Sequence, residues 1–165
     1  AYTAAPEAFD TTLSMLHYHA AKTDYNPQDG QVVGEHDGAH YFTKGQRKGL
    51  GVGGTVEPLF VIDTDVKENI IYTGQGKQHP GLYRRGLLVK PNDIHWVRAD
   101  MRLDLGEQME VMARIRYRQP LEKATLFQEK EGLFVLFDQS QSAIAEGQFV
   151  AWHQGEELLG SGVIS

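Results

Sequence analysis

The stretch Met109-Glu-Val-Met-Ala-Arg-Ile-Arg-Tyr-Arg118 alternates apolar and polar residues from Val111 onward. Side chains along a β-strand point to opposite faces in turn, so this alternation predicts a strand with one apolar and one basic face. The apolar members would share one face: Val111, Ala113, Ile115 and Tyr117. The basic members would form a row on the other face: Arg114, Arg116 and Arg118.

Further short apolar segments surround this stretch in the second half of the chain. With it they give six candidate strands: Ile94–Val97, Met109–Tyr117, Ala124–Gln128, Leu133–Phe137, Gln148–Trp152 and Glu157–Ile164. Strands that recur about every 8–12 residues are typical of a small barrel or sandwich. We predict a six-stranded antiparallel β-barrel over residues 91–165.

The first half predicts a smaller β module over residues 31–90. Its strands would be Leu59–Asp63, Asn69–Thr73 and a hairpin that pairs Val32–Gly34 with Tyr41–Thr43 across the turn His36-Asp-Gly38. Residues 1–30 predict one short helix, which starts at Asp10-Thr-Thr12, and a linker. The predicted fold class is mainly β: a short N-terminal helix, a central β module and a C-terminal barrel.

Composition excludes several classes of protein. The chain has 165 residues and no cysteine, which excludes disulfide scaffolds, thiolate zinc sites and thiol nucleophiles within it. No apolar run approaches the roughly 20 residues of a membrane span, and no signal peptide is recognisable. We therefore expect a cytoplasmic protein without a membrane partner. The net charge of −6 is concentrated after Lys90 and argues mildly against nucleic-acid binding.

The glycine-rich segment Gly45–Gly54 is the densest local motif. Gly49, Gly51 and Gly54 match G-x-G-x-x-G, but no helix follows and no βαβ unit surrounds them, so a dinucleotide site is not supported. The loop would instead display three cations: Lys44, Arg47 and Lys48. A flexible backbone with exposed N–H groups and cations suits a phosphodiester chain. On spacing alone, a solvated glycine-rich turn is an equally good interpretation.

No arrangement of side chains predicts a metal or catalytic site. His17 with His19, and His36 with His40, lack a third ligand at a recognisable spacing. The arginine row could clamp phosphates, but pairing with acidic residues on neighbouring strands is the better interpretation from these residues alone.

Taken together, the motifs resemble the bacterial tRNA-specific 2-thiouridylases from about Val32 to the C-terminus. The resemblance begins in Gly34-Glu-His-Asp-Gly38 and in Tyr41–Gly54, which holds the glycine-rich string. It continues in order through Phe60–Asp63, Asn69–Ile71, His79-Pro80, His95-Trp96, Arg116–Gln119, Phe137-Asp138, Gly147-Gln148 and Leu159–Ile164.

The resemblance implies a function in making 2-thiouridine at the wobble position of tRNA. In that family an N-terminal domain binds ATP with Mg, and its cysteines relay sulfur from a donor protein. The resemblance implies that this chain is the tRNA-binding portion of such an enzyme. Because no nucleotide-binding loop and no cysteine is present, we expect it to be without cofactor and inactive alone. We expect no DNA partner. The alternatives are a non-enzymatic barrel that docks a protein partner through its acidic half, and a small-molecule enzyme that uses the glycine-rich loop.

The resemblance also assigns site residues. Arg116 and Tyr117 match a pair that the family uses against tRNA, and Gln148 matches a further tRNA contact. Lys44, Arg47 and Lys48 fall in the signature loop and are assigned to RNA or to a domain interface. The sequence departs from the family pattern at Phe149 and His153.

Overall fold

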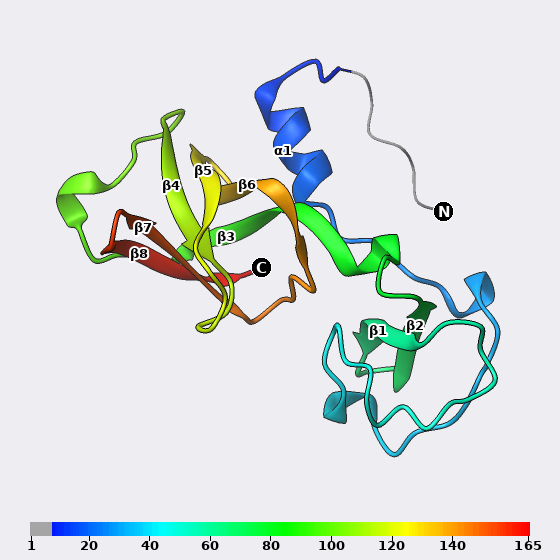
Figure 1. The fold of residues 1–165 in the computed structure, drawn as a ribbon. Coiled ribbons are helices and arrows are strands. Elements are labelled where there is room, and N and C mark those ends of the chain that lie inside the picture. Colours follow the sequence, from blue (N-terminus) through cyan, green and yellow to red (C-terminus); the bar gives the residue numbers. More distant parts are fainter. Residues whose placement is uncertain (1–7) are drawn as a thin grey trace. The chain divides into compact units, whose positions relative to one another are not determined.

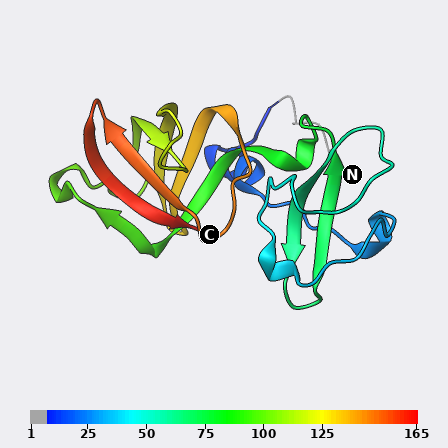
Figure 2. The same cartoon turned by 60° about the horizontal axis from the view of Figure 1, so that its bottom comes forward.

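A computed structural model describes residues 8–165, which form two compact units (Figures 1 and 2). One unit joins the described residues up to 21 with residues 84–165, and the other comprises residues 22–83. The N-terminal helix thus groups with the barrel strands, whereas the segment that follows it groups with the central strands. The predicted fold class, mainly β with one short helix, is confirmed.

The barrel unit is a closed sheet in the order β3-β6-β5-β4-β7-β8. Its strands are β3 (Tyr83–Trp96), β4 (Gln108–Arg114), β5 (Glu122–Glu129), β6 (Gly132–Ser142), β7 (Phe149–Gln154) and β8 (Glu157–Ile164). A short 3₁₀ helix, η4 (Ala99–Met101), lies between β3 and β4. The predicted six-stranded antiparallel barrel is therefore confirmed.

The inward-facing side chains of these strands form one hydrophobic core. Val111, Ala113, Leu126, Phe137 and Trp152 are buried within it. Burying a side chain such as Val111, Leu126 or Phe137 contributes about 1.5–3 kcal/mol. This gain favours apolar residues at the inward-facing positions of β4.

Strand β3 extends further than its sequence suggests. The sequence predicts only Ile94–Val97, because Lys90-Pro91 indicates a turn that ends the preceding module. In the structure β3 continues through both residues. Its register with β8 shifts between Val89 and Ile94, so Pro91 lies where regular pairing is interrupted and its missing N–H costs little. Gly132 packs against this strand: a Cβ there would lie 2.1 Å from the Val89 carbonyl oxygen.

Helix α1 (Thr12–Ala20) packs on the barrel wall. Thr11 and Ser14 cap its first turn reciprocally, so the predicted cap segment is confirmed. Leu16 is buried, and the Arg84 Nη1 donates to the Ala20 carbonyl at 3.1 Å. Gly86 allows the close approach, because a Cβ at that position would lie 2.9 Å from the Ala20 nitrogen.

The central unit is built on the antiparallel pair β1 (Leu59–Asp65) and β2 (Ile70–Gln75). Three 3₁₀ helices accompany them: η1 (Pro27–Asp29), η2 (Ala39–Tyr41) and η3 (Pro80–Leu82).

The predicted hairpin of Val32–Gly34 with Tyr41–Thr43 is wrong. Neither segment is a strand: residues 32–34 belong to no helix or strand, and the second segment begins at Tyr41, the last residue of η2. The cause is a long-range contact, because the Ala39 N–H donates to the Asn69 side-chain oxygen at 2.8 Å and fixes the helical turn.

Candidate functional site

Arg116 and Tyr117 lie in a turn, because strand β4 ends at Arg114. The Gln119 side-chain oxygen accepts the Ile115 N–H at 3.1 Å, which replaces the next ladder bond and stops the strand. Tyr117 therefore does not continue the apolar face of the strand: its side chain is 87% exposed. The arginine row is also not a strand face, since only Arg114 belongs to β4.

Two backbone carbonyls hold the Arg116 side chain. Its Nη2 donates to the oxygens of Ser142, at 2.8 Å, and Ala143, at 3.0 Å, where β6 ends. Burial lowers the pKa of Arg116 from its usual value, but a guanidinium remains charged at neutral pH. The contact orders a cation at the surface before any ligand arrives.

Gln148 belongs to the loop that begins beside Arg116. Its side-chain oxygen accepts the Ala145 backbone N–H at 3.2 Å, and its backbone N–H donates to the Ala145 carbonyl at 3.3 Å. The β6–β7 loop, residues 143–148, therefore starts at the carbonyls that accept from Arg116 and ends at Gln148. The structure brings Arg116, Tyr117 and Gln148 to one end of the barrel, which we call the RNA-candidate end.

The cationic loop of the central unit is also ordered by hydrogen bonds. Gly45 N–H donates to the Val61 carbonyl at 2.7 Å, and Val61 N–H donates to the Gln46 carbonyl at 2.9 Å. The Gln46 side chain accepts from the Thr43 N–H and donates to the Lys48 carbonyl. Arg47 and Lys48 are exposed and Lys44 is half-buried. These cations belong to a different unit from Arg116.

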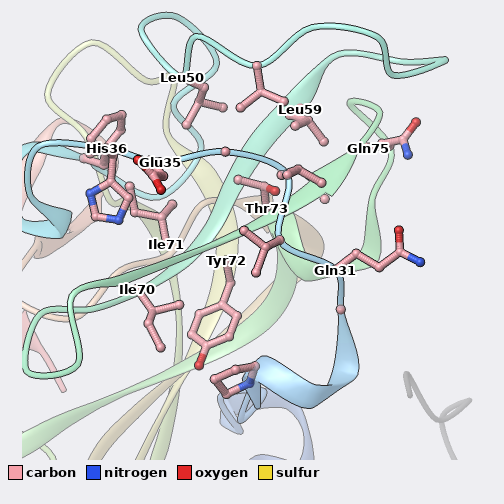
Figure 3. A pocket seen from close by; sticks show the side chains of 18 of the residues that line it. Gln31, Glu35, His36, Leu50, Leu59, Ile70, Ile71, Tyr72, Thr73 and Gln75 are labelled. Carbon is pink, nitrogen blue, oxygen red and sulfur yellow. The ribbon is translucent and has the colours of Figure 1, made fainter.

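Two hollows lie beside this loop within the central unit. The larger, of about 700 Å³, is lined by side chains from β2, from residues 30–36 and from the glycine-rich loop, among them Leu50, Leu59 and Ile71 (Figure 3). Burial and the nearby carboxylates of Asp65 and Asp63 raise the pKa of Tyr72 on its wall. The smaller, of about 540 Å³, is formed by the glycine-rich backbone with Arg47 among its lining residues.

Residues 8–165 contain no group of three or more His, Cys, Asp or Glu side chains placed to hold a metal ion. His17 instead contacts Glu131, with 3.0 Å between Nε2 and Oε1. No helix in the same part of the chain has the length and apolar character needed to cross a membrane.

Sequence reasoning missed Gln119 and Gln141, which support the RNA-candidate end. They join the turn after β4 to β6 by a side-chain hydrogen bond of 2.6 Å. Two glutamines 22 positions apart give no periodic signal. Only the pairing of β5 with both β4 and β6 brings their segments close enough to bond.

Comparison with known proteins matches both units. Residues 19–75 match the family described as tRNA methyl transferase PRC-barrel domain, and residues 84–164 match the aminomethyltransferase β-barrel domain. The chain is 62% identical over 157 residues to the tRNA-specific 2-thiouridylase MnmA of Christiangramia forsetii, covering 95% of this chain and 40% of that protein.

Two further relatives carry the same name. The protein of Flavobacterium johnsoniae is 62% identical over 150 residues, which are 91% of this chain and 38% of that protein. The protein of Karelsulcia muelleri is 47% identical over 144 residues, which are 87% and 37% of the two chains. The chain, which spans about two fifths of the length of these relatives, belongs to the tRNA-specific 2-thiouridylase family.

Proposed function

We propose that this chain is the tRNA-binding portion of an ATP-dependent tRNA sulfurtransferase that forms 2-thiouridine at the wobble position. The observation that carries the proposal is the ordered guanidinium of Arg116, held on two backbone carbonyls beside the exposed ring of Tyr117. The names of the relatives supply the reaction and the substrate.

The geometry at the RNA-candidate end suits a polyanion. An arginine presents several N–H donors in a planar fork, and such forks bind phosphate oxygens with charge-assisted hydrogen bonds. Because Arg116 is already fixed, little side-chain entropy is lost when a phosphate binds. Tyr117 and Gln148 add an aromatic face and a polar side chain at the same end.

The loop of the central unit supplies further cations in this proposal. Lys44, Arg47 and Lys48 lie on or beside backbone that Gln46 holds in place. Phosphate contacts of this kind position a nucleic acid without reading its sequence. They would add affinity to the contacts made by the barrel.

The proposal assigns the chemistry to another domain of the parent enzyme. That domain would bind ATP with Mg, carry the cysteines and receive sulfur from a donor protein, and the enzyme would work in the cytoplasm. No catalytic residue is assigned within these 165 residues.

The test measures binding of fluorescently labelled tRNA to this chain at several KCl concentrations. Arg116→Ala should weaken binding about tenfold and reduce the salt slope by about one. Arg102→Ala is the matched control, since this exposed arginine lies in the same unit outside the RNA-candidate end and should have little effect. Urea unfolding of each variant separates lost binding from lost fold.

An unchanged tRNA affinity in Arg116→Ala, or equal losses in the two arginine variants, would reject the site. Absence of any salt-sensitive tRNA binding would reject the function. Stoichiometric binding of a protein would then favour the alternative, a barrel that docks a protein partner.

A further inference from the structure

One row of residues crosses four strands on the outer face of the barrel. Arg114 on β4 pairs with Ala151 on β7, Ala151 pairs with Ser161 on β8, and Ser161 pairs with His95 on β3. Neighbouring strands lie about 4.8 Å apart, so the row spans roughly 14 Å. The two middle residues are small, which leaves a shallow surface between Arg114 and His95. We call this set the Arg114–His95 row.

The burial pattern shows that this row faces outward. Val150 and Trp152 on β7 are buried, whereas Phe149 before them and Ala151 between them are not. His95 is exposed, and Ala113, the neighbour of Arg114, is fully buried. Alternation along each strand therefore places the row on the side away from the core.

Two aromatic rings lie at one end of the row. Phe149 is two residues before Ala151 on the same face of β7 and is 67% exposed. Tyr117 follows Arg114 after the end of β4, and the Arg114 guanidinium carbon lies 5.3 Å from the centre of its ring. Strands β4 and β7 are antiparallel, so the end of β4 lies beside the start of β7. Tyr117, which follows β4, and Phe149, which begins β7, therefore belong to the same end of the pair.

Three arginines lie close to the Tyr117 ring along the chain, and Glu122 on β5 is paired with Ala113 beside them. Arg114, Arg116 and Arg118 lie within five positions of each other. Glu157, at the far end of β8, is paired with Arg98. Glu146, in the β6–β7 loop, interacts electrostatically with Arg84. The face therefore combines exposed aromatic rings with cations, although the chain as a whole carries −6.

We propose that this outer face binds an unpaired stretch of RNA. Bases stack on Tyr117 and Phe149, and the sugar-phosphate backbone follows the Arg114–His95 row. An exposed ring can stack only on a base whose face is accessible, which a duplex does not offer. The inference rests on the proposed function and extends it, because it specifies which structural feature of the RNA the barrel recognises and adds Phe149, Arg114 and His95 to the interface.

The experiment compares two labelled probes at one salt concentration with the same 165-residue chain. One probe is a single-stranded RNA of about 12 nucleotides, a length within the range that small β-barrels bind, and the other is the duplex of that strand with its complement. The chain should bind the single strand more tightly. Tyr117→Leu and Phe149→Leu should each weaken single-strand binding about fivefold or more, and should leave duplex binding almost unchanged.

Leu105→Ala provides the matched control. Leu105 has the same 67% exposure as Phe149 and lies in the same unit, but in the turn before β4, away from the row. This variant should bind the single strand like the parent chain. All three substituted side chains are exposed, so each variant should keep its fold.

Equal affinity for the two probes, or unchanged single-strand affinity in both aromatic variants, would overturn the inference. If tRNA binding still depended on Arg116 in that case, the proposed function would stand without it. Failure of the chain to bind tRNA at all would remove both proposals.

Discussion

The Gln119 side-chain nitrogen donates to the Gln141 side-chain oxygen at 2.6 Å. Gln119 also accepts the Ile115 N–H through its oxygen, and Gln141 donates to the Gln139 carbonyl. Gln141 is only 5% exposed. This pair of amides therefore fixes the turn after β4, which carries Tyr117, to strand β6. The carbonyls at the end of β6 accept from Arg116.

Replacing Gln141 with leucine should destabilise the barrel unit by about 1–3 kcal/mol, because the partly buried Gln119 amide loses its acceptor. Urea unfolding, followed by the fluorescence of Trp96 and Trp152 in the barrel unit, measures the change. Gln139→Leu is the control: its side chain is exposed and only its carbonyl accepts from Gln141. Equal free energies of unfolding for the Gln141→Leu and Gln139→Leu variants would show that the amide pair does not stabilise the barrel unit.

Acidification should destabilise the barrel unit through His153. Burial, and then the positive charge of Arg114, lower the pKa of this histidine in the folded state. The unfolded chain, with a histidine pKa of about 6.5, therefore binds protons first as the pH falls. This contribution to stability is complete above pH ~6.5 and is lost below it.

Chemical unfolding at pH 7.5 and pH 5.5 tests this dependence. His153→Phe should show a smaller loss of stability between the two pH values than the parent chain does. His19 also has a lowered pKa, caused by burial and by Arg85, so a variant that replaces both histidines should show the smallest loss. An identical pH dependence in the parent and in both variants would contradict the assignment.

The sequence predicts the barrel well because each strand carries its own signal. Alternation along β4 is imposed by core burial on one side and solvent on the other, and the same cause operates in every strand of the closed sheet. Local patterns cannot show where tertiary contacts intervene. Gln119 ends β4 before Tyr117, and Asn69 converts residues 39–41 into a helical turn.

The candidate site is predictable in part for the same reason. Arg116, Tyr117 and Gln148 stand out as a group through resemblance, and the structure brings them together. The supporting pair of glutamines and the Arg114–His95 row depend on strand register, which places Ala151 and Ser161 between two residues far apart in sequence. No motif of adjacent residues encodes that arrangement.

Helix α1 should contribute to the stability of the barrel unit. Leu16 is 1% exposed, so Leu16→Ala should cost about 2–5 kcal/mol, whereas Leu13→Ala, on a side chain 36% exposed, should cost much less. Thermal unfolding of both variants measures the difference. Similar melting temperatures for the two would show that the helix does not pack on the barrel in solution.

The glycine-rich loop of the central unit should contact tRNA phosphates directly, so its cations should affect binding more than other cations of the same unit do. Each RNA phosphate neutralised by a cation adds about 0.7–0.9 to the slope of log affinity against log salt, so Arg47→Ala with Lys48→Ala should lower the slope for tRNA by about 1.5. Lys67→Ala with Lys77→Ala removes the same charge from the same unit, at positions outside the loop. That control should change the slope far less. Equal effects in the two double variants would favour the simpler interpretation, in which Arg47 and Lys48 are solvated charges on a glycine-rich turn and act only through the overall field of the protein.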